Sequence, residues 1–529
     1  MSPTPPREGT PQDLLDQASA AHRDGRFEEA IGLYRRLAAT FPEVAELHVN
    51  MGVALRLSGR PDEAVAAFDR ALDLAPVQTG IHFNRGNALT DLDRLGEAEA
   101  AYRAALEMTP DFLPAVTNLG DLLTRRASHT EAVELYDGAL AAAPGHPELL
   151  NNLGNALACL GRYEDAETCL AAAVAADPGR AVYLKNLGAV RQALGRWAEA
   201  EDVFNRALSV DPKDADGHCL RAFARLGQGH YGDGWDDYGH RWRSTDFEAR
   251  RPFPAPPWDG TTLAGKQLLV WGEQGIGDEI MFATMIPDLI AAGARVTLEC
   301  SHRLAGLFER SFPDTAVVPR LQSPRRELAA VPFDWQTASG DLGRHLRRDE
   351  KAFPAQKSLL KPDPPRAESI RQRYRSIAGD RRLIGLTWRS GAEATGAQRS
   401  LGIDDLYPLA GPDRVFVNLQ WGGVEDDLAR FEIETGQAII DDPDVDPLGD
   451  MDAVAAQMAA LDLVVTAANT AVHVSGGLGI ETWVLVPDPP DWRWRSAGER
   501  SPWYPSVRLF RQKTRGDWSQ VVAELARRL

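Results

Sequence analysis

The sequence of 529 residues is poor in cysteine and has no long apolar segment. Its four cysteines lack the spacing of metal ligands and are too few for a disulfide-stabilised scaffold, so a reducing compartment is expected. No run is long and charge-free enough to cross a bilayer, and the start, "MSPTPPREGTPQ", lacks the apolar core of a signal peptide. We therefore expect a cytoplasmic protein, without membrane insertion, that begins with a disordered segment at 1–10.

The sequence also lacks an excess of basic charge. It has 58 basic and 76 acidic residues, a net charge of −18, which argues against nucleic acid or an anionic membrane surface as a partner. Hydrophobic residues make up 44% of the chain and charged residues 25%, as in ordinary globular proteins. The length exceeds what one hydrophobic core supports, so two or three domains are expected.

A period of 34 residues organises the first half of the chain. An alanine allows two helices to approach, a larger apolar side chain four positions later fills the gap, and a proline ends the second helix. This pattern resembles the tetratricopeptide repeat, and it predicts about six repeats over 11–214, then capping helices and a linker over 215–254. The recurring residues are Ala30, Ala64, Ala98, Ala132, Ala166 and Ala200; Tyr34, Phe68, Tyr102, Tyr136, Leu170 and Phe204; and Pro42, Pro76, Pro110, Pro144, Pro178 and Pro212.

Asparagines follow the same period and predict a ladder along the groove of the solenoid. An asparagine side chain both donates and accepts hydrogen bonds, which suits it to hold the backbone of an extended acceptor peptide. The alternative is that each asparagine bonds to a neighbouring helix. Self-association through the repeats is a further expectation. The rungs are Asn50, Asn84, Asn118, Asn152 and Asn186.

After a proline-rich connector the pattern changes to short β-branched runs that alternate with amphipathic helices. This alternation predicts an α/β region with parallel sheets. We expect two doubly wound, Rossmann-like domains at 255–378 and 379–529, the second closed by a C-terminal helix. Domains that face one another form a cleft at the carboxyl ends of their strands.

The glycine-rich turn in "KQLLVWGEQGIGDEI" follows the first of these strands. Gly272, Gly275 and Gly277 have the order G-x-x-G-x-G, the reverse of the dinucleotide fingerprint, although Glu299 lies about where a ribose-binding acid would be. A second stretch, "GTTLAGKQ", is close to a Walker A motif. It lacks the Ser or Thr and precedes a strand instead of following one, so we discard it.

The ordered set of motifs over nearly all of 235–529 resembles the GT-B glycosyltransferases, particularly the heptosyltransferase-like branch. It comprises "GWDDYGHRW", "WDG", "GEQGIGDEI", "LTWRSG", "NLQWG", "ALDLVVTAANTAVHVSGGLG" and "WRW…SPWYPSVRLFRQ…GDW". The whole chain is similar to bacterial tetratricopeptide glycosyltransferases, among them flagellin glycosyltransferases. Its repeats resemble those of O-linked N-acetylglucosamine transferases. The resemblance implies an all-α solenoid followed by a GT-B fold, with the acceptor side first and the nucleotide-sugar side second.

The resemblance implies that Asp278, in "GIGDEI", is the catalytic base of an inverting transfer, with Glu273 in reserve. Such a transfer needs a base for the acceptor hydroxyl and positive or dipolar groups for the leaving phosphate. Asp278 could instead cap its helix, because aspartate is favoured at helix starts, or bind donor or acceptor.

Donor binding is expected at two further elements. In "ANTAVHVSGGLG" a helix start and two glycines would meet a phosphate, and His473 would donate a hydrogen bond or else be a packed histidine. Arginines after "RLIGLTW" would stabilise the leaving phosphate or form solvated pairs. Relatives carry aspartate where this chain has Asn469. The candidates are Gly275, Gly277, Trp388, Arg389, Arg399, Ser400, Gln420, Trp421, Asn469, Thr470, His473, Gly476 and Gly477.

Aromatic residues in "DWRW" (491–494) and "WYP" (503–505) are expected either to stack on a sugar or base at the cleft mouth or to form an interface core. The carboxylates of "DDPDVDP" (441–447) are interpreted as a loop, and neither a metal nor a bound cofactor is assigned. The predicted function is transfer of a CMP- or UDP-linked sugar to Ser or Thr of a protein acceptor, possibly a flagellin modified with a nonulosonic acid. The alternative is an adaptor with an inert GT-B half.

Overall fold

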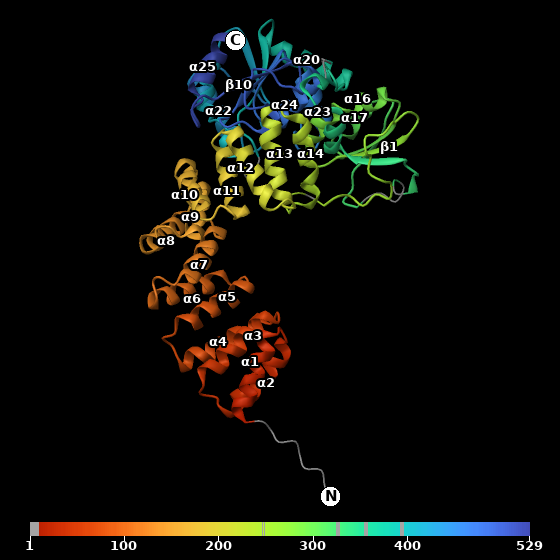
Figure 1. The fold of residues 1–529 in the computed structure, drawn as a ribbon. Helices are drawn as coiled ribbons and strands as arrows, with labels where there is room; N and C mark the ends of the chain where they lie inside the picture. Colours follow the sequence, from red (N-terminus) through yellow and green to blue (C-terminus); the bar gives the residue numbers. More distant parts are fainter. Residues whose placement is uncertain are drawn as a thin grey trace. The chain divides into compact units, whose positions relative to one another are not determined.

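The computed structural model describes residues 10–245, 247, 249–323, 328, 330–353, 358–391 and 396–529. A helical tetratricopeptide solenoid comes first and is followed by parallel sheets and helices (Figure 1). The chain divides into two compact units, Met1–Val190 and Arg191–Leu529. The division lies within a helix, and the last repeat helix packs on the helices that follow it.

The first unit consists of paired antiparallel helices, drawn from red to orange in Figure 1. Among the described residues they are α1 (Pro11–Arg23), α2 (Phe27–Thr40), α3 (Ala45–Leu57), α4 (Pro61–Leu74), α5 (Thr79–Asp91), α6 (Leu95–Met108), α7 (Leu113–Arg125), α8 (His129–Ala142), α9 (Pro147–Cys159), α10 (Tyr163–Ala176) and α11 (Ala181–Ala193), which crosses the division.

The repeat residues pack as the period predicts. The periodic alanines are fully buried, and so are the larger side chains four positions later. Four of the larger side chains, Phe68, Tyr102, Tyr136 and Leu170, lie against a glycine of the preceding helix: a Cβ built on Gly52 would lie 2.6 Å from the ring of Phe68, and one on Gly86 2.5 Å from Tyr102. The glycines therefore set how closely the helices approach.

The turn inside each repeat adopts a left-handed backbone conformation. Gly25 and Gly161 have φ of 76° and 75°, which glycine adopts without strain. Asp93 and Ala127 occupy the same position with φ of 57° and 58°. The solenoid therefore imposes this conformation even where the sequence lacks glycine.

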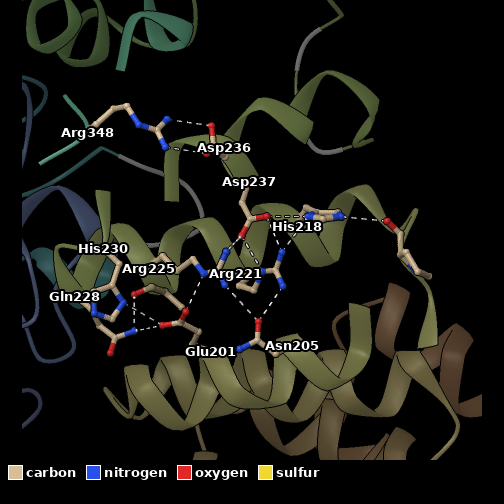
Figure 2. Close-up of polar contacts among 12 residues, drawn as sticks. Glu201, Asn205, His218, Arg221, Arg225, Gln228, His230, Asp236, Asp237 and Arg348 are labelled. Carbon is tan, nitrogen blue, oxygen red and sulfur yellow. Dashed lines mark hydrogen bonds and ion pairs between the residues drawn. The ribbon is translucent and has the colours of Figure 1, made fainter. Parts of the chain in front are cut away.

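The second unit opens with α12 (Trp197–Val210), α13 (Ala215–Gln228), α14 (Tyr231–Tyr238) and η1 (Gly239–Arg243). Figure 2 shows Asp237 of α14 at the centre of a polar cluster. Its carboxylate accepts hydrogen bonds from Arg221 at 2.7 Å, and from Arg225 and His218 at 2.8 Å. Burial alone would raise the pKa of Asp237, but Arg221, His218 and Arg225 hold it below its usual value.

The first sheet has four parallel strands in the order β3-β2-β1-β4. They are β1 (Gln267–Trp271), β2 (Arg295–Cys300), β3 (Ala316–Pro319) and β4 (Trp335–Ala338). The described helices of this region are α15 (Ile276–Ala283), α16 (Ile286–Ala291), α17 (Ala305–Ser311), η2 (Ser339–Leu342), α19 (Gly343–Leu346) and η3 (Glu350–Ala352).

The second sheet has six parallel strands in the order β10-β9-β8-β5-β6-β7. They are β5 (Arg382–Thr387), β6 (Arg414–Asn418), β7 (Ile439–Ile440), β8 (Leu463–Ala467), β9 (Thr482–Val486) and β10 (Val507–Arg511). The described helices are α20 (Pro364–Ala378), α21 (Gly396–Arg399), η4 (Ile403–Leu409), α22 (Glu425–Thr435), α23 (Met451–Ala459), α24 (Thr470–Leu478), η5 (Trp492–Trp494) and α25 (Ser519–Arg528).

A single hydrophobic core joins the two sheets. It includes Val270 of the first sheet and Val464 of the second, and α15 packs directly against α24. Both helices follow the carboxyl end of a strand, so this packing brings the carboxyl ends of the two sheets together. Among the described residues, no helix is both long enough and apolar enough to cross a bilayer.

Candidate functional site between the two parallel sheets

The turn after β1 places one carboxylate in the core and another at the start of α15. Glu273 is buried and accepts hydrogen bonds from Arg241 at 2.6 and 3.0 Å and from the Gly340 amide at 2.9 Å. These bonds give Glu273 a structural role in place of the predicted reserve base. Gly275 is the N-cap of α15.

Asp278 caps its helix and faces a cavity at the same time. One carboxylate oxygen accepts the Gly275 amide at 3.4 Å, which is weak capping. The other accepts Nε and Nη2 of Arg493 at 2.9 and 2.6 Å. The two interpretations of Asp278, cap and cavity residue, are thus compatible.

Arg493 lies between two carboxylates and belongs to a chain of alternating charge. Its Nη1 donates to Asp491 at 3.0 Å, and Asp491 accepts Arg399 at 3.1 Å. Burial alone would raise the pKa of Asp491, but Arg493 and Arg399 hold it below its usual value. Burial opposes charge on Arg493 as well, yet Asp278 and Asp491 raise its pKa. Asp491 and Arg493 are therefore both charged at neutral pH.

The β8–α24 turn supplies the opposite wall. Asn469 is the N-cap of α24, accepting the Ala471 amide at 2.9 Å, and its amide group donates to Thr387 at 2.9 Å and to the Arg389 carbonyl at 3.1 Å. An aspartate could accept the Ala471 bond but could not make the two donations. Asn469 therefore ties the β5 loop to the start of α24.

His473 is buried beside this wall. Its Nδ1 is 3.0 Å from the Tyr504 hydroxyl, and burial lowers the pKa of His473 to about 4, so the imidazole is neutral. A Cβ on Gly277 would lie 2.9 Å from the ring, so Gly277 is needed for His473 to fit. The residue is thus both packed and in the cavity wall.

Five predicted donor residues are scaffold and do not line the cavity. Trp388 is fully buried and donates to Asp427, and Arg389 pairs with the same carboxylate at 3.3 Å. Ser400 accepts the Ser390 amide. Gly476 and Gly477 lie so close to Tyr504 and Leu360 that a Cβ would meet them at 2.6 and 2.8 Å. These glycines serve helix packing and do not line the cavity.

The loop after β5 is shaped by Gln420 and Trp421. Gln420 accepts the backbone amides of Trp388 and Arg389 at 3.1 and 2.8 Å and also lines the cavity. The Trp421 side chain packs so closely over Gly391 that a Cβ there would lie 2.6 Å away. Trp421 is 44% exposed, which leaves an indole face at the cavity wall. Residues 392–395 of this loop lie outside the described part of the chain.

The walls enclose a cavity of about 480 Å³ at the carboxyl ends of both sheets. A cavity of this size is within the range of small-molecule sites. Its polar and charged lining comes from both sheets: Asp278, Arg303, Thr387, Ser390, Arg399, Gln420, Asn469, Thr470, His473 and Arg493. Gly275, Gly277, Trp421 and Trp494 also line it.

Sequence reasoning missed two arginines of this cavity. Arg303, shortly after β2, donates to the Pro447 carbonyl at 3.1 Å. Among the described residues it forms no ion pair with a carboxylate, so it brings unbalanced positive charge to the cavity. Arg493 lies within "DWRW", where the sequence analysis considered only the tryptophans. The feature that could have indicated its role is an arginine between two aromatic residues in the segment after a strand.

The aromatic residues of 491–494 and 503–505 have both of the expected roles: some line the cavity and others belong to the core. Trp494 lines the cavity, 5.4 Å from the His473 ring. Trp492 and Trp503 are buried and pack against Trp235 of α14, so they are core. Of the acidic loop, Asp442 accepts hydrogen bonds from Tyr374 and Arg373 and is structural.

The asparagine ladder of the first unit is not uniform. Asn118 donates to Asn87 at 2.7 Å, Asn152 accepts from Asn151 at 3.0 Å, and Asn186 donates to Asn151 at 2.8 Å. Asn118 and Asn186 thus bond to another helix, as the structural alternative predicted, whereas Asn152 bonds to the adjacent residue of its own helix. The half-buried side chains of Asn50 and Asn84 have no hydrogen-bond partner among the described residues.

Comparison with known proteins supports the repeats directly. Models of the tetratricopeptide repeat match residues 15–79, 83–147 and 148–213. Two solved structures are similar to the chain. A tetratricopeptide repeat protein from Parabacteroides merdae is 18% identical, with 43% of this chain and 91% of that one covered and a TM-score of 0.38. YrrB, titled a TPR protein with an unusual peptide-binding site, is 21% identical, with coverages of 35% and 95% and a TM-score of 0.31.

A curated relative is Protein FlbA of Caulobacter vibrioides, 34% identical over 321 residues. The match takes in 58% of this chain and 53% of the relative, so this chain spans about half the length of the relative. The matched stretch is longer than the helical repeats alone, so it includes part of the α/β region.

Proposed function

We propose that the protein is a GT-B glycosyltransferase whose repeats hold a protein acceptor and whose cavity binds a nucleotide sugar. The observation that carries the proposal is the cavity itself. It lies at the carboxyl ends of two facing parallel sheets, where α/β proteins bind ligands, and it joins one acidic side chain, Asp278, with three arginines. The resemblance of the ordered motifs over 235–529 to GT-B glycosyltransferases is the basis for proposing sugar transfer as the reaction.

Each group of the cavity has a chemical task in this proposal. Asp278 accepts the proton of an acceptor Ser or Thr hydroxyl, whose oxygen attacks the anomeric carbon as the bond to the leaving phosphate breaks. Arg399 and the amino end of α24 stabilise the negative charge that develops on that phosphate. Neutral His473 donates or accepts a hydrogen bond beside them, and the exposed face of Trp421 stacks on the base.

The donor is proposed to be a CMP- or UDP-linked sugar. Arg303 is well placed for a second anionic group, because it is a cation of the same cavity and pairs with no carboxylate in the described part of the chain. The motif resemblance makes a flagellin the proposed acceptor, modified in the cytoplasm. Protein binding by the repeats is the part of this proposal that the matched family model supports.

The test is a transfer assay with purified protein, a CMP- or UDP-linked sugar and flagellin, read by the mass of the acceptor. Asp278→Asn keeps the cap but cannot take a proton, so transfer is expected to fall by about 10²-fold or more. Stabilisation by the nucleotide should persist. Near-normal transfer by that variant would remove Asp278 as the base. An acceptor mass that never changes, with binding to the repeats intact, would favour an adaptor with an inert GT-B half.

A further inference from the structure

The candidate base, Asp278, is already engaged in this structure, because its carboxylate forms an ion pair with Arg493. Two guanidinium nitrogens donate to the same carboxylate oxygen of Asp278, at 2.6 and 2.9 Å. Both N–H groups point at the lone pairs of this oxygen, so an incoming hydroxyl cannot donate to it while the two bonds persist. For Asp278 to act as a base, the ion pair with Arg493 has to loosen.

Arg493 has an alternative use within the same cavity. It lines the cavity together with Arg399, and both arginines share the carboxylate of Asp491. The Arg493 side chain is only 18% exposed, so any anion that enters meets it with little water between. The non-bridging oxygens of a phosphate can replace those of the carboxylate, because arginine binds both groups with the same fork of donors.

The surroundings allow Arg493 to change partner without losing its place. Its guanidinium lies over the Trp492 ring, 4.5 Å from the centroid, and its Nη1 stays bonded to Asp491. Asp278 keeps the Gly275 amide as a partner. Among the described residues, neutral His473, the hydroxyls of Tyr504 and Tyr238, and Arg399 also face the pair.

We infer that Arg493 is a positioning switch: it restrains Asp278 until the phosphate of the bound donor takes over its guanidinium donors, which releases the carboxylate for the acceptor hydroxyl. This inference rests on the proposed function. It couples the arrival of the donor to the availability of the base. The site would then be ready for transfer only when a donor is present.

The inference predicts that Asp278 and the nucleotide compete for Arg493. Asp278→Asn removes the competitor's charge, so CMP or UDP should bind about 3- to 10-fold more tightly than to the wild type. Asp278→Asn would also tighten nucleotide binding in a second way, by removing the electrostatic repulsion between Asp278 and the phosphate. The same substitution in the Arg493→Gln background separates these two causes, because the repulsion is still present there but the competition for Arg493 is not.

The experiment is a double-mutant cycle on the full chain, with CMP and UDP affinities measured by calorimetry for wild type, Asp278→Asn, Arg493→Gln and the double variant. Arg493→Lys is a second variant that keeps the charge in case Arg493→Gln folds poorly, and thermal unfolding checks every protein. We expect Asp278→Asn to tighten binding only where Arg493 is present. Equal tightening in both backgrounds, or none with Arg493 present, overturns the switch and leaves the proposed function standing. A wild-type protein that binds no nucleotide overturns the proposed function itself, and the switch with it.

Discussion

The two units of the molecule use charge in different ways. In the first unit, Arg26–Glu29 and Arg94–Glu97 are surface pairs that leave about half of each side chain exposed, 50% and 52% in one and 43% and 52% in the other. In the second unit, Arg241–Glu273 is 0% and 6% exposed. Surface pairs add little stability, whereas breaking a buried pair leaves a charge without compensation. These pairs of the solenoid are thus at its surface, whereas the second unit holds a buried ion pair at Glu273, in the turn after β1.

The largest expected effect comes from breaking a buried pair of the second unit. Arg241→Met leaves Glu273 buried without its cation, and the free energy of unfolding of that unit should fall by about 3–5 kcal/mol. Chemical denaturation followed by tryptophan fluorescence measures it. Arg94→Met, in a surface pair of the first unit, is the matched control and should change the free energy of unfolding of its own unit by less than about 1 kcal/mol. Circular dichroism follows this variant, because residues 1–190 contain no tryptophan. Similar losses of unfolding free energy in both variants would contradict the expected difference between buried and surface ion pairs.

A pH-dependent loss of stability is expected from Glu279, a buried carboxyl of α15. Burial raises the pKa of Glu279 to about 7, above the usual 4.5, so the folded unit holds its proton more tightly than the unfolded chain does. The stability from this group is present below pH 4.5 and is lost as the pH rises through 7. The wild type should lose about 3 kcal/mol relative to Glu279→Gln between those limits. Parallel stability curves for the two proteins would refute this pKa shift.

The asparagines of the ladder are expected to fall into two groups, those that bind the acceptor and those that stabilise the solenoid. Asn50 and Asn84 have no partner in the solenoid, so replacing both by alanine should weaken acceptor binding by about 1–3 kcal/mol and leave helicity intact. Asn118 and Asn186 bond to neighbouring asparagines, so the matched double variant should lower the melting temperature of the solenoid instead. Pull-down of flagellin beside circular dichroism distinguishes them. The opposite assignment would show that the bonded rungs are the ones that contact the acceptor.

The smallest expected effect is at the repeat turns of the first unit. Ala127 has φ of 58°, a left-handed conformation that an alanine adopts only with strain. Ala127→Gly should therefore raise the stability of the solenoid by about 0.5–1 kcal/mol, and Gly161→Ala at the equivalent turn should lower it by a similar amount. Thermal unfolding of both variants checks the pair. A loss of stability on Ala127→Gly would mean that the entropy of the unfolded chain outweighs the strain.

The repeats were predictable because their signal is periodic and local. Ala30 or Tyr34 needs only its own helix pair to be buried, and the same contact recurs every 34 residues. The parallel sheets were predictable from apolar strands that alternate with helices.

The cavity was predictable only in outline, because side-chain partners distant in sequence decide it. Asp278 and Arg493 are 215 residues apart, and nothing local to either residue indicates their ion pair. Arg389 and Glu273 have the right chemistry, but they turn to Asp427 and Arg241 instead. Arg303 was missed because a single arginine after a strand carries no pattern.

Calorimetric titration of the purified protein with CMP, UDP, GDP and ADP tests the central claim most directly, that the cavity between the two sheets binds the donor nucleotide. We predict binding of one CMP or UDP per chain. Arg399→Gln should weaken it at least about tenfold, because a charged donor to the phosphate is lost. Arg94→Gln, on the solenoid surface, should leave it unchanged. The absence of binding for all four nucleotides, or equal affinities for wild type and Arg399→Gln, would contradict the account.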